Sequence, residues 1–343
     1  MVEAILEPEL PIIDPHHHLW DRRNAPPLVS DHPFMQVVAP IKAYLLDELM
    51  ADLRSGHNVI ATVYAECKAF YRVDGPEALR SIGETEAVNG FAAQTASGIY
   101  GDIRVCAGIV GRVDLTLGER AADILQMHVD AGGGRFRGVR NSAGHDDDPA
   151  VVGAHSAHVH DLYAREDFRR GLRQLAPLGL SFDAWVLEPQ LPYVVDLARA
   201  FPDTTIVLDH VGTPLGSGRY LGRREERFPI WRRNMAELAR CENVAMKLGG
   251  LGMSHPNFPS FRARPPATSE QLAQDWRPYV ETCIELFGAE RCMFESNFPV
   301  DIGSGSYATL WNAFKRLAAG ASADEKAALF SGTARRIYRL DLP

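Results

Sequence analysis

The sequence has few cysteines, no surplus of positive charge and no long apolar run. Its five cysteines among 343 residues show no Cys-x-x-Cys spacing, which disfavours a disulfide framework and a cysteine-rich metal site. No stretch of about 18 apolar residues is present, which excludes a conventional transmembrane helix. The formal net charge of −8 disfavours a nucleic-acid partner, because phosphate contacts need a basic surface.

Two further signals are missing. The first residues carry Glu3 and Glu7, whereas a secretion signal needs a basic segment and then an apolar run. We therefore expect no export, and a cytoplasmic location with reduced thiols. No Gly-x-Gly-x-x-Gly follows an expected strand, so a dinucleotide-binding fold lacks its signature.

What the sequence does contain is a regular alternation of short β-branched runs and helical periodicity. It predicts strands at residues 12–14, 58–66, 105–110, 136–141, 180–186, 205–210, 244–248 and 291–297. It predicts helices at residues 44–56, 84–97, 117–130, 167–177, 191–200, 228–240, 271–287, 306–318 and 323–336. Eight strand-then-helix units fit an α/β fold of the (β/α)8 TIM-barrel type. We expect residues 1–343 to form one domain.

Three connections are long, and all follow strands. They cover residues 142–160, 211–227 and 249–270, after the fourth, sixth and seventh expected strands. In a TIM barrel these loops lie on the face that carries the active site. The first contains a run of histidines and aspartates, including His155 and His158, but its spacing matches no compact ligand set.

The first expected strand runs into three adjacent histidines, in residues 11–20 with the sequence PIIDPHHHLW. Side chains alternate along an extended chain, so His16 and His18 should point to one side and His17 to the other. Two imidazoles side by side at a strand end are a spacing suited to a divalent metal.

Other strand ends also carry ionisable or polar groups, which in a barrel converge on one volume. Asp183 would be costly to bury without a cation or proton partner, and Lys247 equally so without an anion. The candidate catalytic residues are His210, Asp183, Asn297 and Glu66. The candidate substrate-binding residues are Arg140, Lys247, Trp20 and Trp185.

These segments resemble the amidohydrolase superfamily, in the branch that includes sugar-lactone and aromatic-pathway lactonases. The resemblance rests on IDPHHHLWD at residues 13–21, FRGVR at 136–140, LDHVG at 208–212 and MFESNFPVD at 293–301. It implies a TIM-barrel hydrolase with a divalent metal, zinc by preference, held by His16, His18 and His210. Some lactonases of this branch are thought to work without a metal.

One position departs from that pattern. The superfamily usually has an aspartate at the eighth strand end as metal ligand and base, and Asn297 stands there. An amide ligates metals weakly and cannot accept the proton. Either the metal is weak or absent, or another carboxylate acts as base; the candidates are Glu295, Asp301, Asp183 and Glu66.

The leading interpretation is hydrolysis of a small carboxylated lactone by metal-assisted attack of water. The anionic substrate is suggested by arginines in the two later loops, namely Arg219, Arg223, Arg224, Arg227, Arg262 and Arg264, because arginine suits bidentate carboxylate binding. The first alternative is a metal-dependent decarboxylase of a small aromatic or unsaturated acid. The second is a non-catalytic barrel that binds a small molecule. A homo-oligomer is compatible with the sequence.

Overall fold

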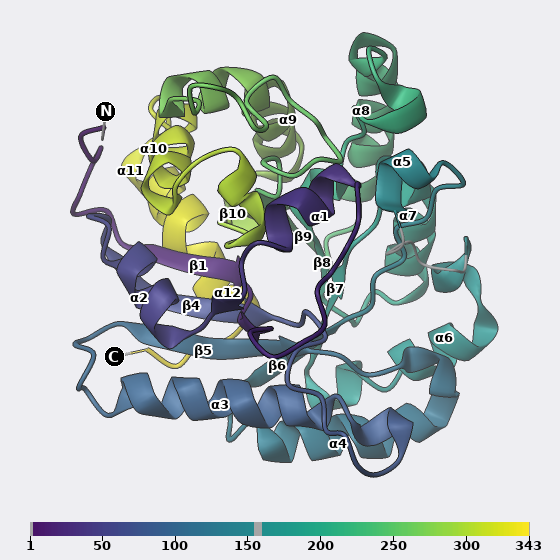
Figure 1. The fold of residues 1–343 in the computed structure, drawn as a ribbon. Coiled ribbons are helices and arrows are strands. Elements are labelled where there is room, and N and C mark those ends of the chain that lie inside the picture. The colour runs from purple at the N-terminus through teal and green to yellow at the C-terminus, as the bar shows by residue number, and fades with distance from the viewer. Residues whose placement is uncertain (1–2, 154–159, 343) are drawn as a thin grey trace.

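The computed structural model describes residues 3–153 and 160–342. Its centre is an eight-stranded sheet in which every paired neighbour is parallel. The strands, in order around the sheet, are β1 (Ile12–His17), β4 (Val59–Ala65), β5 (Arg104–Gly111), β6 (Phe136–Arg140), β7 (Ser181–Ala184), β8 (Ile206–Leu208), β9 (Val244–Leu248) and β10 (Cys292–Phe294). Order in the sheet therefore follows order in the chain (Figure 1).

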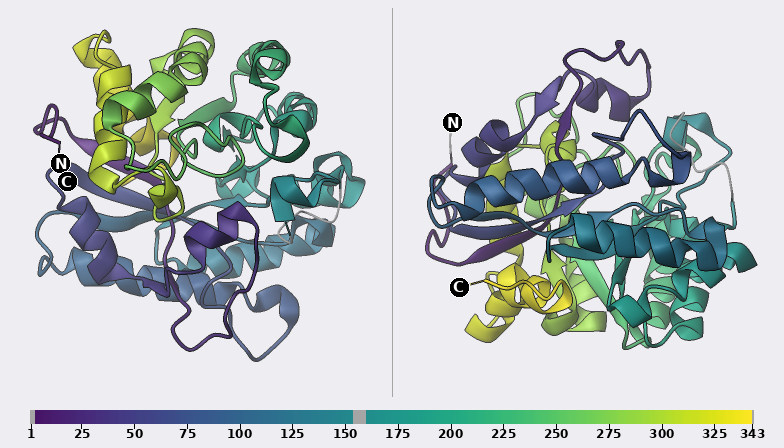
Figure 2. Two further views of the ribbon diagram at one scale, coloured as in Figure 1. Left: turned by 45° about the horizontal axis from the view of Figure 1, so that its top comes forward. Right: turned by 90° about the horizontal axis from the view of Figure 1, so that it is seen from below.

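Helices surround these strands on the outside, as the two views of Figure 2 show. They are α1 (Pro33–Val38), α2 (Leu46–Leu53), α3 (Ile82–Ala96), α4 (Ala121–Ala131), α5 (Pro149–Val152), α6 (Glu166–Leu172), α7 (Leu191–Ala200), α8 (Arg224–Ala239), α9 (Ser269–Phe287), α10 (Tyr307–Leu317), α11 (Ala323–Ala327) and α12 (Thr333–Ile337). A two-stranded antiparallel sheet, β2 (Trp20–Asp21) with β3 (Ala43–Tyr44), precedes α2. The predicted TIM barrel is confirmed.

The barrel closes between its first and last strands by a few contacts instead of a full ladder. His17 and Phe298 form an isolated parallel bridge. The Asn297 N–H donates to the His16 carbonyl at 2.9 Å, and the His18 N–H donates to the Phe298 carbonyl at 2.8 Å. The backbone beside the histidines is therefore bonded directly to the end of β10.

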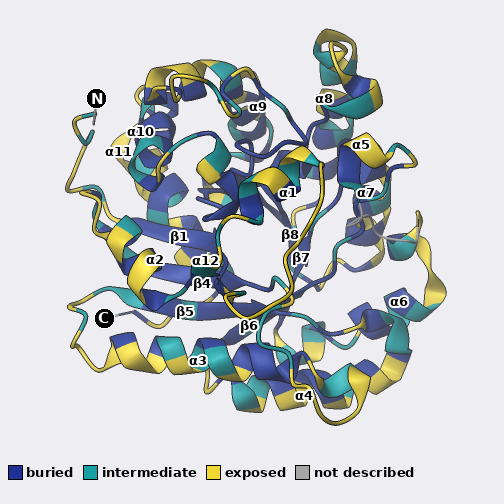
Figure 3. Cartoon of the chain, viewed as in Figure 1, coloured by how far each residue is buried: buried dark blue, intermediate teal, exposed yellow. Residues whose placement is uncertain are grey.

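Buried apolar side chains fill the barrel and the layer beneath the helices. Strand residues are almost entirely buried, whereas the outer turns of α2, α3 and α8 are exposed (Figure 3). The cluster that includes Ile13, Val63 and Val207 from the strands also contains Tyr338 and Leu340 from the C-terminal segment. The end of the chain thus contributes to the same interior cluster as the strands.

Local sequence explains several element ends. Thr268 and Gln271 form a capping box at the start of α9, and Gly288 with φ of 77° follows its last residue. Ser306 accepts from the Thr309 N–H and begins α10. Such caps satisfy backbone groups that a helix end leaves unpaired.

Some boundaries differ from the prediction. The predicted helix at 323–336 is helical throughout, but a π-helical turn at Ala328–Gly332 lies between α11 and α12. Helix α8 starts at Arg224, four residues before the predicted start at 228. The two-stranded sheet of β2 and β3 and the short helices α1 and α5 were not predicted.

Other expectations can be compared directly. All five cysteines are unpaired, as expected, while the cytoplasmic location stays a prediction. Within the described ranges, no helix is long and apolar enough to cross a bilayer. His155 and His158 of the 142–160 loop lie outside the described residues.

Candidate active site

The histidines at the end of the first strand lie as alternation predicts. The Nε2 atoms of His16 and His18 are 3.3 Å apart, and both side chains are buried. His17 points the other way, with its Nε2 2.8 Å from the Thr62 hydroxyl. The strand therefore places the imidazoles of His16 and His18 side by side.

The partners of these rings define which nitrogen carries the proton. His18 Nδ1 lies 2.8 Å from the Ala65 carbonyl, which can only accept, so this nitrogen donates. Arg140 Nη1, which can only donate, lies 3.2 Å from His16 Nε2, so this nitrogen accepts. His16 Nδ1 lies 2.8 Å from Glu295 Oε2. Lys247 Nζ is 3.1 Å from that nitrogen, but Asp183 is a nearer partner of the ammonium at 2.7 Å. The two facing Nε2 atoms therefore both present lone pairs.

Facing lone pairs fit a shared cation. Two ligands at tetrahedral zinc, with bonds of about 2.0–2.1 Å, stand roughly 3.3–3.4 Å apart, and the two Nε2 atoms match this separation. Burial lowers the pKa of His16 and of His18, so both rings are neutral, the form that ligates a metal. Among the described residues, His16 also belongs to a possible metal-holding group with Asp209 and His210, whose ligand atoms lie within 4.8 Å.

The charges of the cluster also favour a bound cation. The buried carboxylates are Glu66, Asp183, Asp209 and Glu295, and the buried fixed cations are Arg140 and Lys247. With all four acids ionised, four negative charges against two positive ones leave an excess of two, or of one when His210, whose pKa is raised, is protonated. Neither oxygen of Asp209 has a hydrogen-bond donor in the part of the chain that the structure describes, although Lys247 Nζ lies 3.0 Å away. A divalent cation would satisfy both deficits.

Glu295 links two of the histidines. Its Oε2 is 2.8 Å from His16 Nδ1 and its Oε1 is 2.6 Å from His210 Nδ1. Burial opposes ionisation of this carboxyl, but the two imidazoles lower its pKa to about 2. Burial lowers the pKa of His210, yet the charges of Glu295 and Asp209 outweigh it and the net shift is upward. Glu295 therefore fixes the orientation and proton position of His210, and its second oxygen places a negative charge beside His16.

Each of the two buried cations is held by an acid from a strand two places away in the sheet. Arg140, at the end of β6, places its Nε 3.2 Å from Glu66 and its Nη1 3.2 Å from His16 Nε2. Lys247, on β9, pairs with Asp183 on β7, which also accepts from the Tyr338 hydroxyl at 2.6 Å. Asp183 thus has the cation partner that its burial demanded.

Asn297 is buried at the same strand end but bonds away from the histidines. Its Nδ2 donates to Asp301 Oδ1 at 2.8 Å, and the Gly252 N–H donates to the other oxygen of Asp301 at 3.0 Å. Burial raises the pKa of Asp301 to about 7, despite the nearby His210. The amide therefore acts here as a donor to a second buried acid.

The two tryptophans lie elsewhere. Trp20 is 2% exposed in the main core, and its indole N–H donates to the Ile41 carbonyl at 2.9 Å. Trp185 is half-buried, and its ring centroid is 5.8 Å from that of His255 on the β9–α9 connection. The prediction that Trp20 contacts substrate gains no support from this placement, because its apolar face and its polar atom are both engaged by the core.

The loop arginines have partners within the protein. Arg219 pairs with Asp146, Arg223 with Glu226, and Arg227 with Glu188. Arg224 donates to the Pro256 and Asn257 carbonyls, and Arg262 donates to Gln36. Five of the six predicted arginines therefore have partners within the protein, and the anionic substrate stays a prediction.

Sequence reasoning overlooked Asp209. Strict alternation puts Asp209 and His210 on opposite faces, but β8 ends at Leu208 and His210 has φ of 57°. The chain turns there, so both side chains reach the cluster. An acid and a histidine together at a strand end could have signalled this, as could the bridging carboxylate Glu295.

Fold and cluster together define a TIM-barrel enzyme with a candidate metal centre at the strand ends. The chain belongs to the amidohydrolase family, whose model matches residues 13–340. It is therefore a hydrolase-class enzyme by family.

Comparisons with individual proteins agree with this family assignment. An uncharacterized protein of Sinorhizobium fredii is 34% identical, over 97% of this chain and 99% of its own. An L-fucono-1,5-lactonase of Burkholderia multivorans is 28% identical, over 96% and 97% of the two chains. The crystal structure of a Burkholderia multivorans amidohydrolase with bound zinc has a TM-score of 0.72 and 26% identity, over 96% and 99%.

Proposed function

We propose that this enzyme is a lactonase, which opens the ring of a small lactone by adding water across its ester bond. The observation that carries the proposal is the pair of facing Nε2 atoms of His16 and His18, 3.3 Å apart at the barrel mouth. The lactonase name of the Burkholderia multivorans relative supports this reaction over other hydrolyses.

The proposed cofactor is zinc, held by His16 and His18 together with Asp209, whereas His210, the other predicted ligand, is proposed to carry the proton. The zinc-bound relative and the charge excess of the cluster support this choice. When bound, the ion would polarise the ester carbonyl and lower the pKa of a water molecule. Asn297 stands where the family usually has an aspartate. Glu295 and Asp209 compensate for the loss of that aspartate, because they bring carboxylates to the same cluster.

His210 is the proposed proton carrier. Its Nδ1 is bonded to Glu295 at 2.6 Å, which leaves Nε2 to take a proton from water as the oxygen attacks the carbonyl carbon. The carbon–oxygen bond of the ring then breaks, and His210 returns the proton to the departing ring oxygen. The product is a hydroxy acid. Glu295 stabilises the imidazolium that exists between the two steps.

Arg140 and Lys247 are proposed to stabilise negative charge. The Arg140 Nη1 lies 3.2 Å from His16 Nε2, so the guanidinium borders the point where the two histidines meet. Donors fixed by Glu66 and Asp183 need no reorganisation when an oxyanion develops on the substrate. Asp183 itself has Lys247 and Tyr338 as partners, so it acts by positioning Lys247 rather than as base.

The direct test is a panel of lactones incubated with zinc-loaded protein, with acid release followed by a pH indicator. We expect ring opening of at least one 1,5-lactone with saturation kinetics. No lactone opening together with carbon dioxide release from a dihydroxybenzoate would instead establish the decarboxylase alternative. Thermal stabilisation by lactones without turnover of any of them would establish the non-catalytic alternative.

A further inference from the structure

The connection after β9 begins with the sequence Gly-Gly-Leu-Gly at residues 249–252, called the glycine segment below, and it lies directly against two residues of the site. A Cβ on Gly249 would lie 2.4 Å from Glu295 Cγ, and a Cβ on Gly250 would lie 2.3 Å from His210 Nδ1. Glycine is the residue that allows a backbone to approach so closely. The backbone of the glycine segment therefore packs on the Glu295–His210 pair itself.

This contact limits the movement of the proposed proton carrier. The His210 Nδ1 is held by Glu295 Oε1 at 2.6 Å, and Gly250 lies against the same edge of the imidazole ring. All four residues of the glycine segment are buried. Protein interiors are close-packed, so a ring enclosed in this way changes its rotamer only when its neighbours move. The position of the glycine segment therefore decides whether Nδ1 stays on Glu295.

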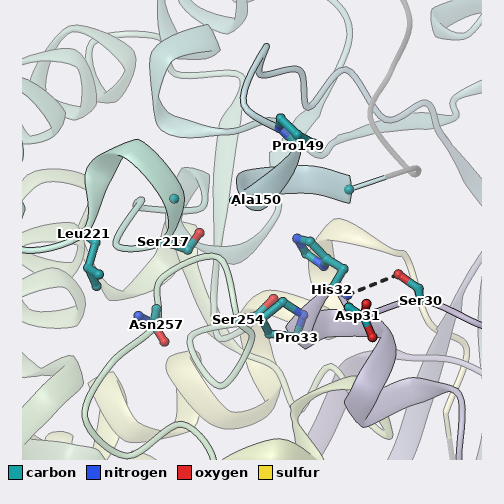
Figure 4. Close-up of a pocket in the computed structure, with 12 residues that line it drawn as sticks. Ser30, Asp31, His32, Pro33, Pro149, Ala150, Ser217, Leu221, Ser254 and Asn257 are labelled. Carbon is teal, nitrogen blue, oxygen red and sulfur yellow. Dashed lines mark hydrogen bonds between the residues drawn. The ribbon is translucent and has the colours of Figure 1, made fainter.

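The same connection borders open space a few residues further along the chain. Ser254 and Asn257 line an open pocket of about 580 Å³ that lies among the loops (Figure 4). Packing on that side of the connection is therefore incomplete. Hydrogen bonds gain importance in holding the glycine segment against His210.

Two hydrogen bonds from the turn after β10 hold Gly252. The Gly252 N–H donates to Asp301 Oδ2 at 3.0 Å, and the Gly252 carbonyl accepts from the Ser304 hydroxyl at 2.9 Å. The approach is so close that a Cβ on Gly252 would lie 2.9 Å from Asp301 Cγ. Asp301 and Ser304 are both buried, where hydrogen bonds are stronger than in water. The glycine segment is thus fastened at its end to residues 301–304.

Asp301 is held in turn by Asn297. Its Oδ1 accepts from Asn297 Nδ2 at 2.8 Å, and its N–H donates to the Asn297 carbonyl at 3.2 Å. Each carboxylate oxygen thus accepts from one N–H group. An amide in place of this carboxyl could keep both partners, because its oxygen can accept from Gly252 and its NH2 group can donate to Asn297 once the Asn297 amide is turned over.

We propose that Asp301 is a positioning residue, which holds the glycine segment against His210 and Glu295 by accepting the Gly252 N–H. This inference rests on the proposed function, in which His210 carries the proton. Without the bond at Gly252, the glycine segment can move away and His210 Nδ1 can leave Glu295. Asp301 acts as a hydrogen-bond acceptor in this role, so it takes no part in proton transfer.

The test uses the zinc-loaded, full-length enzyme. Asp301→Ala removes the acceptor of the Gly252 N–H, whereas Asp301→Asn keeps one. Ser304→Ala removes only the second bond to Gly252, and it takes the place of Asp301→Ala if that variant does not fold. Asp275→Ala is the matched control, because Asp275 Oδ2 accepts from the Ser260 N–H at 2.9 Å on the same connection but outside the glycine segment.

The first readout needs no turnover. The proton that His210 Nδ1 shares with Glu295 should give a strongly downfield signal in proton NMR of protein with isotopically labelled histidine, assigned by its loss in His210→Gln. We expect this signal in the unmodified enzyme, in Asp301→Asn and in Asp275→Ala. It should be lost in Asp301→Ala and weakened in Ser304→Ala. An unchanged signal in Asp301→Ala, or in Ser304→Ala where that variant takes its place, overturns the proposal.

The second readout is ring opening of the best substrate in the lactone panel, measured per bound zinc. In Asp301→Ala, kcat should fall about tenfold with KM nearly unchanged, and Asp301→Asn should restore it to within about twofold of the unmodified enzyme. An equal loss of kcat in these two variants overturns the acceptor role, because the charge of Asp301 would then be what matters. Loss of the NMR signal in Asp301→Ala, with no lactone opened by any form of the enzyme, supports the positioning of His210 and overturns the lactonase function.

Discussion

The backbone of His210 has φ of 57°, in the left-handed region that side chains with a Cβ rarely adopt. This angle ends β8 and turns His210 and Asp209 into one cluster, where a continuing strand would have separated them. Gly250 makes room for the result, since a Cβ there would lie 2.3 Å from the His210 ring. Local backbone strain at this residue is thus coupled to the arrangement of the site.

Removal of both first-strand imidazoles tests the metal centre. His16→Ala combined with His18→Ala should lower bound zinc from one equivalent to nearly none and reduce kcat at least about 100-fold. The measurements are elemental analysis of protein purified without tag or chelator, and lactone turnover. Unchanged zinc content in a folded double variant would contradict the proposed ligands.

Replacement of Glu295 tests the positioning of His210. Glu295→Gln retains size but removes the charge that holds His16 and His210, so kcat should fall about 10- to 100-fold. The upward shift in the pKa of His210 depends on that charge, so the acidic limb of the kcat profile should also move to lower pH.

Asn297→Ala supplies the comparison for this variant. Asn297 bonds to Asp301 rather than to the histidines, so its truncation should cost less activity than the change at Glu295. A larger loss at Asn297, measured as kcat under the same conditions, would show that the amide participates in the reaction.

At the scale of elements, α3 fixes the connection that presents Glu66. One oxygen of Glu84 accepts from the Tyr64 hydroxyl at 2.8 Å and from the N–H groups of Cys67 and Ala69 at 2.9 Å each. The other oxygen of Glu84 has no partner among the described residues. Helix and strand end are therefore joined through one buried acid.

The charge state of that acid predicts a pH dependence of stability. Burial and the neighbouring Glu66 raise the pKa of Glu84 to about 7, so the folded state binds its proton more tightly than the unfolded chain. This contribution to the free energy of unfolding is complete below pH 4.5 and is lost as pH rises through 7.

Glu84→Gln should remove this slope. Between pH 5 and 8, chemical denaturation should show the unmodified enzyme losing about 2–3 kcal/mol more stability than the variant. Parallel curves for the two proteins would show that Glu84 is ionised in the folded state throughout.

Much of the pattern of strands and helices could be predicted from the sequence, because hydrophobic periodicity and turn residues are local properties of the chain. The alternation at His16 and His18 and the eight strand runs are properties of neighbouring residues. The partners of Arg219, Arg227 and Asp183 could not be predicted, because each partner comes from a distant segment of the chain. The strand-end residues could therefore be predicted from the sequence, whereas their pairings and those of the loop arginines could not.

For the whole molecule, the gap between β1 and β10 is bridged by one buried carboxylate. Asp14 accepts from the Ser296 hydroxyl at 2.5 Å, from the Ser296 N–H at 3.0 Å, and from the Tyr307 hydroxyl at 3.1 Å. These bonds replace part of the ladder that the other strand pairs have. The closure of the barrel thus depends on a few side chains.

Ser296→Ala should therefore destabilise the entire fold. Loss of a donor to a buried carboxylate predicts a decrease of about 1–3 kcal/mol in the free energy of unfolding, measured by urea denaturation. Ser55→Ala, at an exposed position, should change it by less than about 0.5 kcal/mol. Equal stability of the Ser296 variant and the unmodified enzyme would show that the bridge and backbone bonds alone close the barrel.

The same closure joins residues 6–16 to residues 297–315. Lys315 holds the Leu6 and Glu7 carbonyls, and the Asn297 N–H is bonded to the His16 carbonyl. During synthesis, the first histidines emerge long before Glu295 and the helices that clasp the N-terminal residues. A nascent chain therefore exposes the imidazoles without their carboxylate partner, and the complete constellation can assemble only after Glu295 has been synthesised.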